Sequence, residues 1–360
     1  NVYAGGHYGA DSLWFVSENS VQPYIQNKPD WINGANGSFI VKIDRDLERV
    51  EWGTYFYAVD GNNHPFEYIP PFKLLLDTKR HPIIAGYAID PYDIDSVKYP
   101  WRYIPQVHAG MNRSRMDQTF VTKLSSDATA YVFSSYYGDS STNRLMDAIC
   151  DADDNIILTG FSGPGFPLMY PIQNGTADGP GPFLMKLSPT GSILASSVLG
   201  SGGTDIGMKI SKDACRNILL FGRSPLISFI PNVRSTDTRG AAMHDLAPFL
   251  AVFDPSCTKL LRSTFLTFPD SSSPNTMIAT PIYSDHRGYL TFGGSSTLGK
   301  QPSYGTFNAF QPSMRGMTDG WLMRFRYPTC ESVDCFIMCS DTLRVANKRK
   351  YITPSRFTIS

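Results

Sequence analysis

Phe120-Val-Thr-Lys-Leu124 is the stretch of this 360-residue chain that decides its fold, because related pentapeptides recur along the sequence. Each copy begins with an aromatic residue, is largely apolar, and ends with a Lys-like position followed by another apolar residue. The other copies are Phe39-Ile-Val-Lys-Ile43, Phe183-Leu-Met-Lys-Leu187, Phe249-Leu-Ala-Val-Phe253 and Trp321-Leu-Met-Arg-Phe325. Self-similarity of this kind predicts a repeat architecture.

A second motif, an apolar strand that usually ends in Gly, recurs as often as the first and alternates with it along the sequence. We assign its five copies to Leu13–Ser17, Ile83–Gly86, Ile156–Gly160, Ile218–Gly222 and Tyr289–Gly293. Asp77, Asp151 and Asp213 precede three of these copies, and Asp285 stands one residue out of place before the last. An Asp at such a position is typical of a tight turn in which the side chain accepts backbone hydrogen bonds.

Two further strands are predicted between the motifs. One is rich in Ser and aromatic residues, as in Ser134-Ser-Tyr-Tyr-Gly138, and the other is more variable, as in Leu145–Cys150. Each unit of roughly 60 to 80 residues then supplies four short strands with Gly and Pro between them, which favours a four-stranded antiparallel blade over a helical solenoid unit. We interpret one sequence unit as one blade.

The two chain ends predict a closed ring. Residues 1–20 hold two candidate strands, Val2–Tyr8 and Leu13–Ser17, and residues 319–339 hold Trp321–Phe325 and Cys335–Cys339. Two complementary halves that share one blade would remove the exposed edges of an open array. We therefore predict an all-β fold, a five-bladed β-propeller of four-stranded antiparallel blades over residues 1–339, closed by the N- and C-terminal strands, with 340–360 as an extension.

The motifs resemble the SBBP family of β-propeller repeats. Its units contain an aromatic-Val-x-Lys-Leu strand, a Ser-Thr-Tyr-x-Gly strand, an Asp turn and an Asn-Val-Tyr-x-Thr-Gly strand, and residues 120–160 match this order best. The family's linker is echoed by Phe166-Pro167 and by Asn308-Ala-Phe-Gln311. The chain departs from the pattern at Val252, at Phe265-Leu-Thr267 and in the insert 88–116. The resemblance implies a propeller that is exported or displayed on a surface, and it carries no catalytic signature.

The composition argues against two classes of partner. Lys plus Arg and Asp plus Glu number 32 each, so no net charge attracts nucleic acid or an anionic membrane. The apolar runs are all shorter than the roughly 18 to 20 residues that span a bilayer. We predict neither nucleic-acid binding nor membrane insertion.

Several features predict an extracellular or cell-surface location. The sequence begins at Asn1 rather than Met, as expected if a signal peptide has been removed. Three glycosylation sequons start at Asn36, Asn112 and Asn174. The six cysteines are disulfide candidates whose pairing stays open: Cys150, Cys215, Cys257, Cys330, Cys335 and Cys339. Cys150 and Cys215 could instead be core thiols. The last three lack the Cys-x-x-Cys spacing and nearby His of a zinc site, so we predict no metal there.

The sequence names no catalytic residue. It lacks a Gly-x-Ser-x-Gly elbow and a P-loop, and its six His residues are scattered singly. Asp77, Asp151 and Asp213 recur from unit to unit, which favours a turn role, since a catalytic pair would break the repeat. No cofactor is predicted, although residues 151–155 and 60–63 leave structural calcium open beside the turn interpretation.

Two segments outside the repeats are candidate interaction surfaces. The insert 90–116 carries Tyr92, Tyr99, Trp101 and Tyr103, which would either bind glycans or proteins or cap one face of the ring. The tail 340–360 has an alternating pattern that would add a strand to a neighbour's edge, unless it is disordered.

We therefore predict a non-catalytic structural, scaffold or adhesion protein. Its expected partners are other copies of itself, in an extracellular assembly or filament, or extracellular matrix or surface proteins. A carbohydrate-binding propeller is the alternative, and a glycoside-active enzyme comes third.

Overall fold

The computed structural model describes fourteen parts of the chain, all of them strands, turns and irregular segments. They are residues 1–8, 13–23, 37–56, 73–88, 107, 117–139, 141–163, 165–172, 181–200, 206–224, 247–265, 278–284, 289–297 and 318–326. A search of these parts finds no helix long and apolar enough to cross a membrane.

The described strands form five antiparallel sheets, each named here by its order along the chain. Sheet 1 contains β1 (Val2–Tyr8), β2 (Gly37–Ile43) and β3 (Val50–Phe56). Sheet 2 contains β4 (Lys73–Leu76), β5 (Pro82–Ala88), β6 (Gln118–Leu124) and β7 (Tyr131–Tyr137). Sheet 3 contains β8 (Arg144–Cys150), β9 (Ile156–Ser162), β10 (Gly181–Leu187) and β11 (Ile193–Val198). Sheet 4 contains β12 (Ile206–Lys212), β13 (Ile218–Ser224), β14 (Ala247–Phe253) and β15 (Leu260–Phe265). Sheet 5 contains β16 (Ile278–Ser284), β17 (Tyr289–Thr297) and β18 (Thr318–Arg326).

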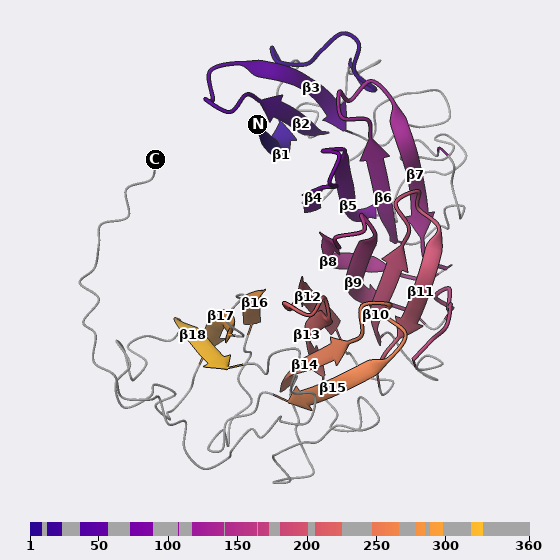
Figure 1. The fold of residues 1–360 in the computed structure, drawn as a ribbon, viewed down its shortest axis with the longest axis vertical. Coiled ribbons are helices and arrows are strands. Elements are labelled where there is room, and N and C mark those ends of the chain that lie inside the picture. Colours follow the sequence, from indigo (N-terminus) through magenta and orange to yellow (C-terminus); the bar gives the residue numbers. More distant parts are fainter. Residues whose placement is uncertain are drawn as a thin grey trace, which may run out of the picture.

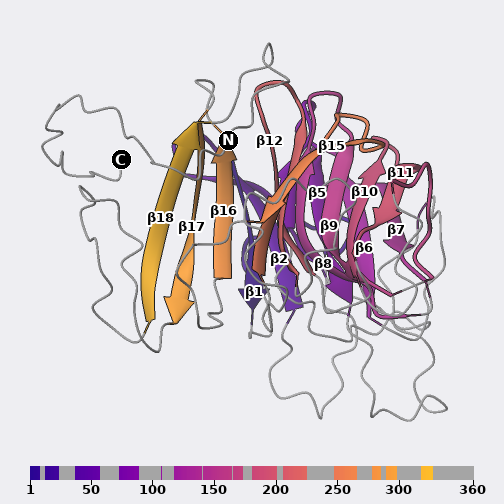
Figure 2. The same cartoon turned by 90° about the horizontal axis from the view of Figure 1, so that it is seen from below.

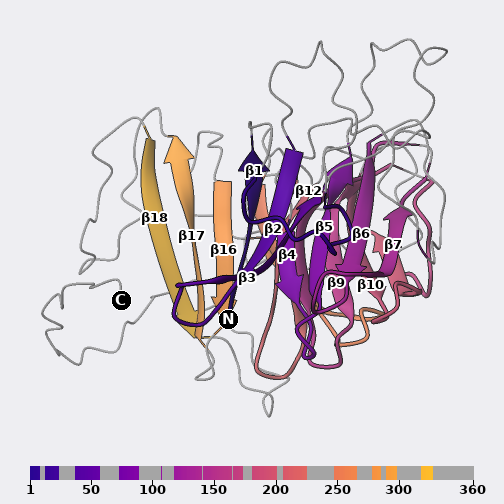
Figure 3. The ribbon, with the colours of Figure 1, turned by 90° about the horizontal axis from the view of Figure 1, so that it is seen from above.

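The five sheets follow one another around an arc, with β4, β8, β12 and β16 on its inner side (Figure 1). From the side, the inner strands of the sheets run roughly along the short axis of the molecule (Figures 2 and 3). Within the described parts of the chain, the predicted all-β class and the antiparallel pairing of the strands are confirmed.

The sheets are out of phase with the predicted sequence units. The Gly-ending strand pairs with the aromatic-motif strand that follows it, and the same register recurs, with Gly86 opposite Phe120, Gly160 opposite Phe183 and Gly222 opposite Phe249. The Ser-rich strand and the variable strand after it lie in different sheets. Interpreting one sequence unit as one blade was therefore wrong by two strands, because sequence adjacency does not reveal which neighbours are hydrogen-bonded.

The same register corrects the first copy of the second motif. Gly6 of β1 lies opposite Phe39, so Val2–Tyr8 is the Gly-ending strand of sheet 1. Leu13–Ser17 is not a strand, since Trp14 and Phe15 form a turn. The Phe15 ring packs edge-to-face on Phe39, with 5.1 Å between centroids. In sheet 3 the linker residue Phe166 also packs on the first motif position, Phe183, although as a stacked pair with 4.8 Å between centroids, so Leu13–Ser17 corresponds to a linker between strands.

The two chain ends do not share a sheet among the described strands. β1 belongs to sheet 1 with β2 and β3, whereas β18 belongs to sheet 5 with β16 and β17. The prediction that Val2–Ser17 and Trp321–Phe325 complete one blade is therefore wrong. Its last element, Cys335–Cys339, lies outside the described residues, as does the tail 340–360.

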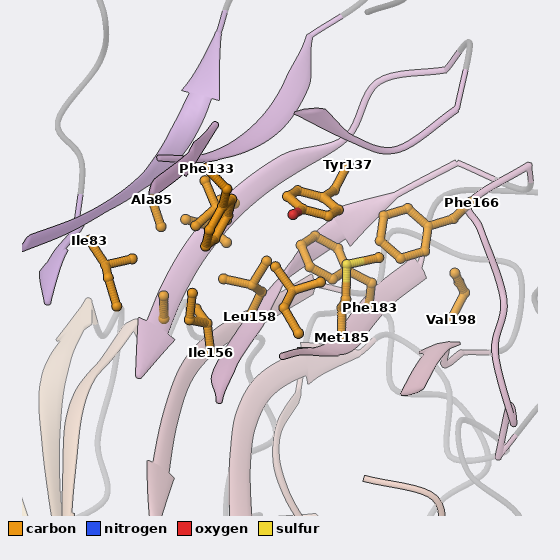
Figure 4. Packing of buried hydrophobic residues seen from close by; sticks show 14 residues of the cluster. Ile83, Ala85, Phe133, Tyr137, Ile156, Leu158, Phe166, Phe183, Met185 and Val198 are labelled. Carbon is orange, nitrogen blue, oxygen red and sulfur yellow. The ribbon is translucent and has the colours of Figure 1, made fainter. Parts of the chain in front are cut away.

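The hydrophobic core lies between successive sheets rather than inside a single one. In the aromatic-motif strands of sheets 2 to 4, positions one and five face the preceding sheet, and in sheets 2 and 3 position two faces the next. Phe120 and Leu124 thus pack on sheet 1, and Val121 packs on sheet 3. Figure 4 shows the cluster between sheets 2 and 3, where Phe133 and Tyr137 meet Leu158, Phe183 and Met185. The two-residue period of a strand explains the motif, because both faces are buried.

Candidate functional site

Buried ion pairs lie at the junctions between sheets, and the fourth position of the aromatic motif supplies their cation. The Nζ atom of Lys123 lies 2.9 Å from Oδ2 of Asp77, and both side chains are at most 4% exposed. In the next sheet Lys186 Nζ lies 2.8 Å from Oδ2 of Asp151. Each pair joins the aromatic-motif strand to the Asp turn of its own sheet. We call these two pairs the junction pairs.

The same lysines also reach the following sheet. Lys123 Nζ donates a hydrogen bond to the carbonyl oxygen of Pro189 at 3.1 Å, in the turn between β10 and β11. Lys186 Nζ donates to the carbonyl of Pro255 at 2.8 Å, in the turn between β14 and β15. Because position four shares a face with position two, its cation points at the next sheet. One lysine thus holds three pieces of backbone together.

The Asp turns repeat atom by atom. In each of them Oδ1 of the Asp accepts the backbone N–H four residues later, from His81, Asn155 or Asn217, at 2.8 to 2.9 Å. Oδ2 contacts the side chain of that same residue at 2.7 to 2.9 Å. The residue before it has a positive φ, close to 65° in all three turns. The turn role predicted for Asp77, Asp151 and Asp213 is confirmed.

The electrostatic environment keeps the junction carboxylates ionised. Burial opposes the charge on Asp77, but hydrogen bonds from Lys123 and His81 outweigh it and lower the pKa of Asp77 below its usual value. Burial is also the largest influence on Asp151, where Lys186 and Asn155 overcome it and lower the pKa of that carboxyl. Each buried cation therefore faces a charged partner at neutral pH.

Neighbouring Asp turns are linked directly to one another. The backbone N–H and the hydroxyl of Thr78 each donate to the carboxylate of Asp154, both at 2.7 Å. Arg216 lies 3.5 Å from Asp153 in the following pair of turns. The stretch 151–155, which left a calcium loop open, already has protein donors on all three of its carboxylates. Among the described residues, no group of three or more His, Cys, Asp or Glu is placed to hold a metal.

The junctions at the two ends of the series differ from the central ones. In sheet 1 Lys42 pairs with Glu51 of β3 at 2.8 Å, and the carbonyl of Ser126 in sheet 2 accepts instead from the indole N–H of Trp52 at 3.0 Å. In sheet 4 Val252 occupies the lysine position, so the cation is lost there.

A carboxylate that the sequence interpretation missed lies on the inner side of the arc. Asp147 of β8 is 4% exposed and contacts Lys73 of β4 at 2.8 Å. On its other side it accepts the backbone N–H of Ile210 at 3.2 Å and lies 4.0 Å from Lys209, both on β12. The variable strand has no motif that would mark Asp147 in the sequence. Chemically, this arrangement ties three inner strands together.

Most of the other residues singled out from the sequence lie outside the described residues. These are the sequon residues Asn36, Asn112 and Asn174, the aromatic residues Tyr92, Tyr99, Trp101 and Tyr103, and the cysteines Cys330, Cys335 and Cys339. Those site assignments remain predictions.

The three described cysteines differ in state. Cys150 and Cys257 are free thiols, so they leave the set of disulfide candidates. Burial raises the pKa of each of these thiols to about 12. Cys257 packs in the core between sheets 3 and 4, which explains why it has no disulfide partner. Cys215, in the Asp turn of sheet 4, is disulfide-bonded.

Comparison with known proteins assigns the chain to no family. No family model matches the chain, and no curated protein is significantly similar to it in sequence. The resemblance to SBBP repeats therefore depends on the motifs themselves.

Proposed function

We propose that this protein is a non-catalytic structural propeller of the extracellular space or cell surface, with a scaffold or adhesion role. Its partners in this proposal are further copies of itself, in an assembly or filament, or extracellular matrix or surface proteins. The observation that carries the proposal is that recurring ionisable residues tie neighbouring sheets together: Lys123 and Lys186 each pair with an Asp of their own sheet and donate to a backbone carbonyl of the next sheet. Ionisable side chains that hold repeats together are typical of a structural protein.

The inner strands support the same proposal. Strands β4, β8, β12 and β16 carry a single carboxylate between them, Asp147, and it is engaged by lysine and backbone. Glycoside hydrolysis uses two carboxyl groups about 5 to 9 Å apart, one as acid and one as base or nucleophile. The described inner surface offers one member of such a pair.

A closed ring of five blades is part of the proposal. In sheets 2 to 4 the aromatic and the last apolar position of the motif are almost completely buried by the preceding sheet. In sheet 1 the equivalent residues, Phe39 and Ile43, are only half-buried. We infer that sheet 5 covers this face, so that the first and last sheets meet as whole blades. Covering two apolar side chains contributes about 25 cal/mol per Å² of area removed from water.

An extracellular setting is supported by three observations. Cys215 is disulfide-bonded, and disulfides persist in oxidising compartments. Three sequons are present, at Asn36, Asn112 and Asn174, and SBBP-like repeats are usually exported. Peptide mass spectrometry of protein secreted from eukaryotic cells, before and after glycan removal, checks this: we expect occupied sequons, and unmodified peptides at all three would contradict an exported glycoprotein.

Electron microscopy of the purified protein tests the assembly role. We expect rings that associate at high concentration, and we expect deletion of 340–360 to leave single rings intact while abolishing the association. A matched control replaces Lys348, Arg349 and Lys350 by Ser, which removes charge but keeps the tail's length and alternating pattern. Association that survives the deletion would refute the assembly arm, and open arcs in place of rings would refute the closed propeller.

The aromatic insert supports carbohydrate binding as a second candidate. Trp101 and its neighbouring Tyr residues are the type of side chain that stacks on sugars, at little cost in conformational entropy. Glycan-array binding that is lost in Trp101→Ala would favour this function over the scaffold. An array without any bound glycan would count against it.

A further inference from the structure

We propose that the inner edge of β1 binds an extended peptide strand of a partner molecule, and that this strand carries an Asp or Glu beside Lys73, followed by two apolar residues. The proposal names an interaction surface that the proposed function does not assign, and it does not depend on that function. It rests on a comparison of sheet 1 with sheets 2 to 4.

The comparison begins with the strand that lies innermost in each sheet. Among the described strands, β1 has a neighbour on one side only, β2. The equivalent strands β5, β9 and β13 each have a second neighbour on the inner side of the arc (Figure 1). These inner neighbours, β4, β8 and β12, all pair antiparallel with them. The repeat therefore defines where an added strand would lie beside β1, and in which direction it would run.

The residues of β1 along this edge are open to solvent. Gly6 takes the place of the glycine that faces the first motif residue in the other sheets. Counting back from it, Gly5 is exposed, whereas its equivalent Ala85 in β5 is 0% exposed. Val2 is 43% exposed, whereas its equivalent Pro82 is buried. The edge of a sheet presents N–H and C=O groups that an incoming strand can pair with, so β1 is accessible to strand addition.

The inner strands alternate in charge at one position of the repeat. Opposite the residue that precedes the conserved-register glycine stand Lys73 in β4, Asp147 in β8 and Lys209 in β12. The Nζ atom of Lys73 lies 2.8 Å from Oδ1 of Asp147, and Nζ of Lys209 lies 4.0 Å from Oδ2 of the same residue. Equivalent residues of successive inner strands thus contact one another across the junctions.

This alternation selects the charge of a strand bound to β1. Its residue opposite Gly5 takes the position that Lys73 takes in β4, and its side chain therefore lies next to Lys73 as Lys73 lies next to Asp147. The Lys73 side chain is 42% exposed and contacts a carboxylate on the side of sheet 3. An Asp or Glu opposite Gly5 adds a carboxylate on the side of sheet 1, whereas a Lys or Arg there would meet a like charge. Charge complementarity favours an acidic residue.

The two positions that follow favour apolar side chains. Leu74 packs in the core between sheets 1 and 2, and Leu75 packs between sheets 2 and 3. In β8, Ala148 and Ile149 repeat this alternation one sheet further on. A strand bound to β1 therefore has the order acidic, apolar, apolar, with its first apolar residue opposite Ala4. Main-chain pairing combined with side chains that point alternately to two faces is how peptides are recognised by strand addition.

Hydrogen–deuterium exchange of the full chain with a synthetic peptide tests the site. The peptide has the sequence of residues 143–149, Asn-Arg-Leu-Met-Asp-Ala-Ile, which contains the acidic, apolar, apolar order of β8. We expect it to slow the exchange of amides in residues 2–6 and to leave that of the outer strand β7 unchanged. The same peptide with Ala148→Pro is the control and should have no effect, because proline lacks the N–H group that a strand needs. Unchanged exchange of β1 at millimolar peptide would refute the site.

Two other occupants of the edge would also refute the proposal, and the same measurement detects them. If the amides of β1 are as well protected as those of β5 in the free protein at every concentration, the chain itself fills the edge. If their protection without peptide increases with protein concentration, a second copy fills it.

A charge reversal tests the role of Lys73. Asp147→Lys in the peptide should weaken its binding to the wild-type protein about threefold to tenfold, because an exposed ion pair becomes a like-charge contact. The two peptides should bind equally to Lys73→Met, but the preference should persist in the control Lys79→Met, at an exposed lysine of the turn after β4. Equal binding of both peptides to the wild-type protein would refute the acidic preference. The exchange experiment on the wild-type chain decides the site even if Lys73→Met fails to fold.

Discussion

Lys186→Met removes one buried cation while keeping an unbranched side chain of similar length. Lys186 lies 2.8 Å from Asp151 and donates to the carbonyl of Pro255 in the next sheet. The substitution leaves the carboxylate, 12% exposed, without its cation. It also leaves the Pro255 carbonyl without this donor. The junction between sheets 3 and 4 should therefore lose its polar bridge while retaining its apolar contacts.

Removing one partner of a buried pair typically costs about 3 to 5 kcal/mol, much of it the penalty of a charge that stays buried and unpaired. The lost hydrogen bond to the Pro255 carbonyl belongs to the same network. Its cost of about 1 to 3 kcal/mol is therefore not added to the cost of the broken ion pair. We expect a loss near 3 kcal/mol, because Asn155 still donates to Asp151 at 2.9 Å. In the double variant Asp151→Asn/Lys186→Met, where the charge itself is absent, the loss should be clearly smaller than the sum of the single losses.

Urea unfolding followed by tryptophan fluorescence measures these losses as shifts of the midpoint and of the extrapolated free energy of unfolding. Lys259→Met is the matched control, since Lys259 is exposed and undergoes the same chemical change. It should alter stability by about 0.5 kcal/mol or less. A Lys186→Met variant as stable as this control would refute the view that the junction pairs hold the sheets together.

Three further predictions follow from particular residues. Because the folded pKa of Asp77 lies below its unfolded value of about 3.9, the stabilisation it gives is complete above about pH 5 and is lost as the pH falls through the folded value. The gap in urea midpoint between wild type and Asp77→Asn should therefore shrink from pH 6 to pH 3, and a constant gap would contradict this. Gly160→Ala would place a Cβ 2.0 Å from the carbonyl oxygen of Arg144, so the variant should lose at least about 1 to 3 kcal/mol in thermal or urea unfolding. Leu194→Ala, at a side chain that is 41% exposed, should change stability far less, and equal losses would argue against the close approach of β8 and β9. Cys257, 1% exposed and with a pKa near 12, should resist iodoacetamide at pH 8 in the folded protein and react in urea.

The repeat was predictable because each of its motifs reflects the local structure of a strand or a turn. The alternation in Phe120–Leu124 follows from two buried faces, and the turn at Asp151 follows from the hydrogen bonds of a single side chain. Both depend on residues close together in the sequence. The all-β class and the antiparallel pairing of the described strands could therefore be derived without coordinates.

The phase of the sheets could not be derived in this way. β5 and β6 pair across the connection 89–117, whereas β7 and β8, only a few residues apart, belong to different sheets. Local composition does not distinguish these two cases. Leu13–Ser17 was misassigned for a related reason, because an apolar linker over Phe39 has the same composition as a buried strand.

The sequence predicted only part of the candidate site. The recurrence of the Asp turns pointed to architecture, and the structure agrees, but the partnership of Lys123 with Asp77 joins positions that are far apart in the chain. The sequence showed that Val252 departs from the lysine pattern, but not what the lysine does in the other sheets. The carbonyl group that accepts a hydrogen bond from that lysine lies in another sheet. Asp147 has no counterpart in the neighbouring inner strands, so no repeat could mark it.

The middle hairpin of each sheet keeps its register whatever the length of its connection. Residues 89–117 join β5 to β6 and residues 163–180 join β9 to β10, yet a glycine faces the motif phenylalanine in both. Lengthening a flexible loop is inexpensive, at about 0.6 kcal/mol per doubling. New sequence can therefore be grafted at this one place, and an engineered epitope inserted between β9 and β10 would be displayed without disturbing the lysine bridges.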